Sequence, residues 1–203
     1  MNRIYLIIKL IFQIKIIFKE PKKYPLVIFD KDSMVDLSEV VKKFDYFVMA
    51  NRIHHIENIY ISANILKIFI KNYKGNVMTA YLVSLLEVIK PKAVVTFIDN
   101  SEKFSDLAKA LSNKTKFVAI QNAYRIDIIE NNYLQKINKK NVILNKYFYI
   151  PKLLCFGQHN IDLYKKCKIK VKDFIKVGSL RLANALRYIK VNKYLYIKNE
   201  KLI

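Results

Sequence analysis

Short apolar runs alternate with amphipathic segments along most of the chain, and turns rich in polar residues separate the two. Strands are predicted at 25–29, 46–49, 93–98, 116–120, 152–156 and 174–177. Helices are predicted at 34–44, from about residue 62 after a short strand, and at 77–89, 102–111 and 160–167. A regular order of strand and helix is typical of a parallel sheet with helices on its faces. The pattern therefore predicts an α/β fold: a Rossmann-like three-layer domain with a mostly parallel sheet.

The clearest strand is Ala93–Ile98, which is rich in β-branched residues and carries no charge, as expected for a strand buried on both faces. The turn that follows it, 99–101, has residue types that favour turns and helix N-caps. Two of the three glycines, Gly157 and Gly178, directly follow predicted strands. We expect sharp turns there, in a backbone conformation that a Cβ would restrict.

Both ends of the chain differ from its centre. Ile4–Phe18 is strongly apolar, but two lysines and a glutamine interrupt it, so it is too short to span a membrane, and it lacks the cleavage site of a signal peptide. We expect a buried strand or helix there, with an interfacial membrane segment as the alternative. The lysine-rich tail after Arg187 is expected to be an edge strand or a loose end. A stretch rich in lysine and asparagine, 131–146, is the best candidate for a local insertion.

These features predict three regions. They are an N-terminal apolar and basic segment packed on the domain (1–23), a Rossmann-like domain (24–182), and the start of a linker or of a truncated second domain (183–203).

Composition supports a buried core, because 53% of the 203 residues are hydrophobic. The 37 Lys and Arg residues against 16 Asp and Glu give a formal net charge of +21, which suits phosphate groups, polyanions or anionic membranes as partners. However, the lysines are spread along the chain and no nucleic-acid-binding motif is present, so nucleic acid is disfavoured. Cys155 and Cys167 have no partners at metal-ligand spacing, so we expect no metal, no disulfide and a reducing cytoplasmic location.

Ligands of open α/β sheets bind at the carboxyl ends of strands, near the point where the strand order reverses. Four predicted turns lie at such ends. The candidate substrate-binding residues in them are Asp99, Asn100, Ser101, Gln121, Asn122, Arg125, Gly157, Gly178, Ser179 and Arg181. Their amides, hydroxyls and backbone N–H groups can bond sugar hydroxyls or a phosphate, and the two arginines can make bidentate contacts to phosphate or carboxylate. The alternative is structural: Asp99 and Ser101 would cap a helix, and Gly178 would only form a tight turn.

No residue is identified as catalytic. His54, His55 and His159 are candidates for acid or base chemistry, since imidazole titrates near neutral pH. Neighbouring residues on a strand face opposite ways, so at most one of the first two can point into a cleft. The sequence contains no GxGxxG, GxxxxGK[ST], GxSxG or HExxH motif, which disfavours dinucleotide-binding, P-loop, serine-hydrolase and zincin functions.

Four segments carry a resemblance to a known family. They are LLEVIKPKAVVTFIDNS, KFVAIQNAYR, LLCFGQHNIDLYKK and IKVGSLR, in that order. Together they resemble the N-terminal domain of bacterial surface carbohydrate (surface polysaccharide) biosynthesis proteins, which share the GT-B-like two-domain architecture of glycosyltransferases. The resemblance covers residues 24–182. Two features depart from it: Ala123 stands where the family usually has glycine, and the residues after Ser179 are too few for a second Rossmann domain.

The resemblance implies a function in surface polysaccharide or lipopolysaccharide biosynthesis. A nucleotide sugar would be the donor substrate, with no cofactor, and a carbohydrate or glycolipid would be the acceptor. The chain would form the acceptor-side half and would be inactive alone. It would be a fragment, a truncated gene product, or a subunit that pairs with a separate C-terminal GT-B domain. It would work in the cytoplasm, as a peripheral protein at the inner face of the cell membrane.

Two other functions stay open. One is a non-catalytic basic module that binds an anionic membrane or nucleic acid through its lysines. The other is a small-molecule binding protein that keeps the fold without turnover.

Overall fold

The computed structural model describes residues 14–50, 52, 56–123, 149–166 and 169–200, the last ten of them as backbone only. The predicted insertion at 131–146 lies outside these residues. The main sheet has the strand order β3-β2-β5-β6-β7-β8, and every pairing between neighbours in it is parallel. Its strands are β2 (Leu26–Phe29), β3 (Tyr46–Met49), β5 (Ala93–Thr96), β6 (Lys116–Ile120), β7 (Tyr149–Cys155) and β8 (Lys170–Lys176). The predicted parallel α/β sheet is confirmed.

Helices cover both faces of this sheet. The covering helices are α2 (Met34–Val41), α4 (Val77–Ile89), α5 (Glu102–Leu111) and α8 (Gln158–Lys166), with a 3-10 turn η1 (Lys31–Ser33) before α2. Two further helices lie outside these layers: α3 (Ala63–Asn72) packs on α4, and α9 (Leu180–Glu200) follows β8. Successive side chains of a strand point to opposite faces, and β2 follows this rule. Val27 and Phe29 join the core cluster beneath α4, α5 and α8, whereas Ile28 joins the cluster beneath α2. The three-layer domain expected from the sequence is confirmed.

Local sequence determines many of the element ends. The observed bounds of β3, α4, α5 and β6 match the predictions. Ser62, Asn76 and Ser101 are N-caps whose side chains accept a hydrogen bond from the backbone N–H three residues on. At the other end of α4, Lys90 adopts a left-handed conformation (φ 53°) just before Pro91. The helix therefore ends there.

The strand predicted at 93–98 is shorter than expected, because Phe97 and Ile98 leave the sheet. The N–H of Ile98 donates to Thr96 Oγ1 at 3.1 Å, and the N–H of Phe97 donates to Ser33 Oγ at 2.9 Å. Side-chain oxygens thus replace the neighbouring strand as partners of these backbone groups.

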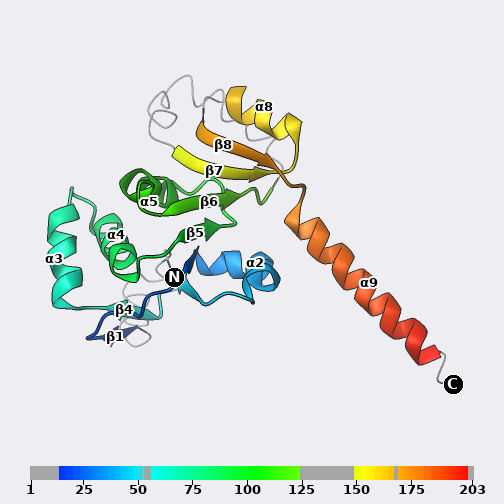
Figure 1. The fold of residues 1–203 in the computed structure, drawn as a ribbon, viewed down its shortest axis with the longest axis horizontal. Coiled ribbons are helices and arrows are strands. Elements are labelled where there is room, and N and C mark those ends of the chain that lie inside the picture. The colour runs from blue at the N-terminus through cyan, green and yellow to red at the C-terminus, as the bar shows by residue number, and fades with distance from the viewer. Residues whose placement is uncertain (1–13, 51, 53–55, 124–148, 167–168, 201–203) are drawn as a thin grey trace, which may run out of the picture.

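Of the apolar segment 4–18, residues 4–13 lie outside the described residues. The described part forms a strand, β1 (Lys15–Ile17), but an exposed one, which pairs in parallel with β4 (Asn58–Tyr60) in a separate two-stranded sheet beside α3 and α4 (Figure 1). Ile16 is 51% exposed and Phe18 80% exposed. Because β1 contacts only one neighbouring strand, its apolar side chains reach the surface.

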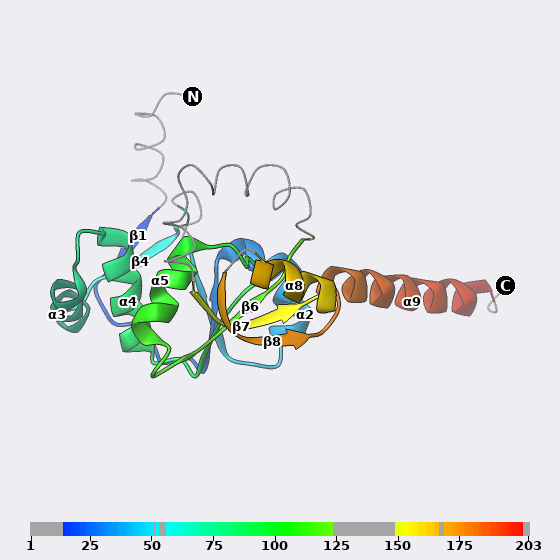
Figure 2. The same ribbon diagram turned by 90° about the horizontal axis from the view of Figure 1, so that it is seen from above.

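The C-terminal tail is also different from the predicted edge strand or loose end. It forms one helix, α9, which starts just after β8 and projects away from the domain (Figures 1 and 2). The segment contains neither glycine nor proline and is rich in leucine, alanine, lysine and arginine, which are good helix formers. Within the described part of the chain, no helix combines the length and the apolar character needed to cross a bilayer.

Of the two glycines predicted to need a special backbone conformation, only one has it. Gly178 has a φ of +76°, while the backbone of Gly157 does not adopt a positive φ. Asp30 instead has a φ of 80°, which is uncommon for a residue with a side chain. The unusual turn therefore follows β2, not β7.

Ser33 holds the ends of two strands together. Its hydroxyl donates to Phe29 O at 3.2 Å at the end of β2, and accepts from Phe97 N at 2.9 Å just after β5. The side chain is buried, so no water can replace it easily. The two hydrogen bonds of Ser33 therefore connect the ends of β2 and β5, the neighbouring strands between which the strand order reverses.

We expect Ser33→Ala to lower the free energy of unfolding by about 1–3 kcal/mol, because it leaves the N–H of Phe97 buried without its partner. Urea denaturation followed by circular dichroism measures this change. The matched control is Ser38→Ala on the exposed side of α2, which should change stability by no more than about 0.5 kcal/mol. Equal effects of the two substitutions would contradict the bridging role of Ser33.

Candidate functional site

A pocket of about 380 Å³ lies at the carboxyl ends of β2, β5 and β6. The chain runs from β2 outward to β3 and then returns to β5 on the other side, so the strand order reverses between β2 and β5. This reversal leaves room for a ligand in open α/β sheets. The described residues that line it, here called the polar pocket, are Asp32, Ser33, Arg52, Phe97, Ile98, Asn100, Asn122, Ala123 and Arg181.

Arg52 forms one wall of the polar pocket and is held by two carboxylates. Its Nε lies 3.1 Å from Asp30 Oδ2 and its Nη1 lies 2.8 Å from Asp32 Oδ2. Asp30 is buried, and its other oxygen accepts from the N–H of Asp32 at 3.1 Å. A buried carboxylate needs such partners, because burial alone would disfavour its charge. Asp30 thus fixes the start of the turn and the direction of Arg52 together.

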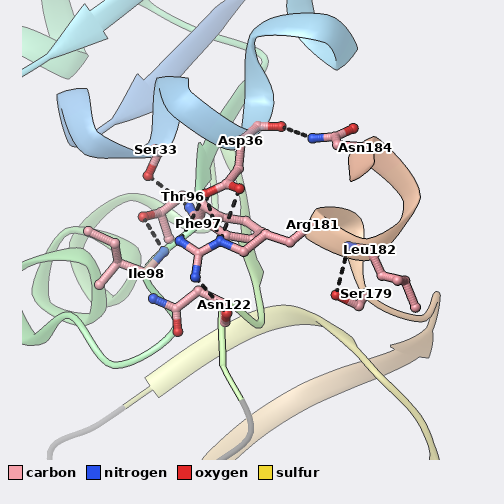
Figure 3. Close-up of polar contacts among 10 residues, drawn as sticks. All are labelled: Ser33, Asp36, Thr96, Phe97, Ile98, Asn122, Ser179, Arg181, Leu182 and Asn184. Carbon is pink, nitrogen blue, oxygen red and sulfur yellow. Dashed lines mark hydrogen bonds and ion pairs between the residues drawn. The ribbon is translucent and has the colours of Figure 1, made fainter. Parts of the chain in front are cut away.

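Arg181, from the first turn of α9, also lines the polar pocket, and Figure 3 shows its contacts. Its Nε and Nη2 bond the carboxylate of Asp36 on α2 at 3.0–3.1 Å, and its Nη1 donates to Asn122 O at 3.3 Å. The guanidinium also lies 5.0 Å from the ring centre of Phe97. The bond to Asp36 raises the pKa of Arg181 above its ordinary value.

Asp36 has a second contact with α9, because the side-chain amide of Asn184 donates to its backbone oxygen at 2.9 Å (Figure 3). The contacts of Arg181 and Asn184 therefore anchor the start of α9 to α2. The bidentate contact that the sequence suggested for Arg181 exists, but a carboxylate of the same chain occupies it. This changes what the pocket can bind.

The charges around the polar pocket nearly cancel. Its two guanidinium groups, from Arg52 and Arg181, pair with three carboxylates, from Asp30, Asp32 and Asp36. Among the described residues the carboxylates therefore exceed the guanidinium groups by one charge. A phosphate is held by cationic side chains that can bond to its oxygens, and here both guanidinium groups already bond to carboxylates. A site of paired charges with amide and hydroxyl groups is better suited to a neutral ligand with many hydroxyls.

The sequence-predicted residues after β5 have separate roles. Asn100 is exposed and lines the polar pocket. Ser101 Oγ accepts from Phe104 N at 3.3 Å, so the predicted helix cap is confirmed for Ser101. Asp99 is buried and accepts a hydrogen bond from the hydroxyl of Tyr164 on α8. Asp99 thus links β5 to α8, and it is not among the residues that line the pocket.

The two amides after β6 also differ. Asn122 lines the polar pocket, whereas Gln121 is fully buried. Gln121 Oε1 accepts from Phe156 N at 3.1 Å and its Nε2 donates to Ala123 O at 3.0 Å. Gln121 therefore joins the ends of β6 and β7.

The turns after β7 and β8 contribute less to this pocket than the sequence suggested. Gly157, Gly178 and Ser179 are not among its lining residues, and Ser179 Oγ accepts from Leu182 N at 3.3 Å in the first turn of α9. His159 is exposed in the first turn of α8. The remaining candidates, Arg125, His54 and His55, lie outside the described residues.

Sequence reasoning missed Asp32, Ser33 and Arg52. Asp32 and Ser33 lie in the turn after the strand predicted at 25–29, which is also a strand end but is not among the four turns selected above. No sequence signal places Arg52 at the pocket. Its partner Asp30 lies 22 residues earlier in the chain, and the two come together through the pairing of β2 with β3.

Cys155, at the end of β7, is buried in the core. Burial, and then the nearby charge of Asp99, raise the pKa of its thiol to about 11. A nucleophilic cysteine needs a lowered pKa and access to solvent, so Cys155 does not fit that role. In the part of the chain that the structure describes, no group of three or more His, Cys, Asp or Glu side chains could hold a metal ion.

Comparisons of the chain with protein-family models, with curated proteins and with solved structures gave no match.

We expect native Cys155 to resist alkylation by iodoacetamide at about pH 8, with a rate at least roughly 200-fold below that of a free thiol, because so little of it is thiolate. Peptide mapping by mass spectrometry separates its labelling from that of Cys167. The same protein in guanidinium chloride is the control and should be labelled quickly. Rapid labelling of Cys155 in the native protein would show that its thiol is reactive after all.

Proposed function

We propose that the polar pocket binds the sugar of an acceptor in surface carbohydrate biosynthesis. The chain then forms the acceptor side of a glycosyltransferase-like protein, as the motifs quoted above imply. The observation that carries the proposal is the pairing of both arginines of the polar pocket with carboxylates at the point where the strand order reverses.

The groups in the polar pocket suit sugar hydroxyls. Asn100 and Asn122 each offer a carbonyl oxygen and an NH₂ group, and Asp32, whose side chain is 45% exposed, offers a carboxylate oxygen. A hydroxyl both donates and accepts, so it can bond to either kind of group. Phe97 and Ile98 add apolar side chains to the lining of the same pocket.

The same charge balance argues for an acceptor over a nucleotide-sugar donor. A diphosphate carries negative charge and is usually held by available cations and by helix N-termini. Here the Nε and Nη2 groups of Arg181 bond to the carboxylate of Asp36, and Arg52 contacts the carboxylates of Asp30 and Asp32. We therefore assign the donor to a second Rossmann-like domain, in a separate chain or elsewhere in the protein, and expect no glycosyl transfer without it.

A second candidate function is binding to an anionic membrane surface. The edge strand β8 exposes Lys170, Lys172 and Lys176, and the formal net charge of the chain is +21. Such binding would place the domain at the cytoplasmic face of the membrane and is compatible with acceptor binding in the polar pocket. Cosedimentation with phosphatidylglycerol vesicles that weakens steeply with added salt would support it.

Titration of the ¹⁵N-labelled protein with methyl glycosides, oligosaccharide fragments and nucleotide sugars tests the acceptor assignment. We expect at least one neutral sugar to shift the side-chain amide signals of Asn100 and Asn122. Asn100→Ala and Asn122→Ala should each weaken binding about tenfold, the effect of losing one good hydrogen bond.

The matched control is Asn64→Ala, at an exposed position of α3 outside the polar pocket, which should leave the affinity unchanged. If no sugar shifted these amides, or if only nucleotide sugars did, the acceptor assignment would be wrong.

A further inference from the structure

A second pocket, of about 680 Å³, lies on the other side of the turn that follows β2. It is here called the apolar pocket, and its described lining includes Met34, Phe47, Met49, Met78, Leu82 and Leu85. These side chains come from α2, β3 and α4. The volume is far larger than the voids of a well-packed core, which seldom exceed a few water molecules. It is within the range of small-molecule sites.

Three polar side chains at the apolar pocket, those of Tyr81, Lys31 and Glu57, already have partners. The hydroxyl of Tyr81 accepts from Tyr60 N at 2.9 Å and donates to Tyr60 O at 3.3 Å. Lys31 and Glu57 form an ion pair with each other. A ligand can therefore gain little there from hydrogen bonds, and the burial of hydrocarbon is the main source of affinity.

One short turn separates this pocket from the polar pocket. Of four consecutive residues, Lys31 and Met34 line the apolar pocket, whereas Asp32 and Ser33 line the polar one. The segment after β3 also contributes to both pockets, because Ala50 lines the apolar pocket and Arg52 lines the polar pocket. An apolar and a polar site thus share a wall built from two backbone segments.

We propose that the apolar pocket holds a hydrocarbon chain, so that the acceptor is a glycolipid whose sugar lies in the polar pocket. The identity of the sugar rests on the proposed function, but hydrocarbon binding does not. Three methionines suit a flexible acyl or isoprenoid chain, because unbranched thioether side chains adapt to different shapes. The charged groups at both pockets are paired with groups of the chain, which fits an uncharged head and an uncharged tail.

A series of alkyl β-D-glucosides, from methyl to octyl and below their micelle concentrations, tests this proposal by calorimetry. Each added methylene should raise the affinity roughly fourfold until the pocket is filled. The increment per methylene is independent of whether glucose is the right sugar. A 1-alkanol series of the same lengths tests the chain without a sugar and should show the same increment.

Ala50→Phe fills part of the apolar pocket and should end the rise in affinity at a shorter chain. Val77→Glu is a second variant, at a lining residue that is 61% exposed, so we expect the charge to leave folding intact. It should reduce the increment per methylene. The matched control is Ala185→Phe at an exposed position of α9, which should bind like the wild type.

An affinity that does not rise with chain length, or a rise that both pocket variants leave unchanged, would overturn the proposal. The acceptor assignment fails separately, when methyl glycosides and oligosaccharides do not shift the amides of Asn100 and Asn122. Asn122→Ala should weaken alkyl glucosides by a constant factor at every length and should not affect the alkanols. An effect of Asn122→Ala on the alkanols would place the chain in the polar pocket and contradict the assignment of two pockets.

Discussion

The hydroxyl of Ser33 is the contact on which the candidate site depends. The backbones of β2 and β5 pair with each other as far as Ile28 and Val95, and beyond that point the two segments diverge around the polar pocket. Ser33 links them there, with one bond to the end of β2 and one to the backbone just after β5. The unusual backbone of Asp30, just before it, directs a buried carboxylate to Arg52. One turn therefore sets both the shape of the polar pocket and part of its charge.

Pairing of charges then decides what this pocket can bind. Although the chain carries a formal net charge of +21, the guanidinium groups at the pocket contact carboxylates of the same chain. Overall charge and local charge thus point to different ligands. The excess of lysine favours attraction to anionic surfaces over the whole molecule, whereas the pocket favours hydroxyl groups. The apolar pocket lies on the other side of the turn formed by residues 31–34. A neutral sugar joined to a hydrocarbon chain would place its sugar in the polar pocket and its chain in the apolar pocket.

Much of the fold could be predicted from the sequence because its signals are local. The β-branched run at 93–96 and the Ser101 cap of α5 depend only on near neighbours. The site could be predicted only in part. The rule of strand ends selected Asn100, Asn122 and Arg181, but it did not distinguish Asn122 from Gln121, whose amide joins two strand ends that are far apart in sequence. Arg181 and Asp36 are 145 residues apart, so their pairing follows from the docking of α9 and not from any local pattern.

The salt dependence of sugar binding tests whether paired charges make the polar pocket a site for neutral ligands. The affinity of the tightest sugar should be measured by calorimetry between about 50 and about 500 mM sodium chloride. Because no counterion is released when a neutral sugar binds to paired charges, we predict an affinity that is constant within about twofold. A steep, roughly tenfold or greater fall over this range would show that unpaired cations hold an anionic ligand, and would contradict the account.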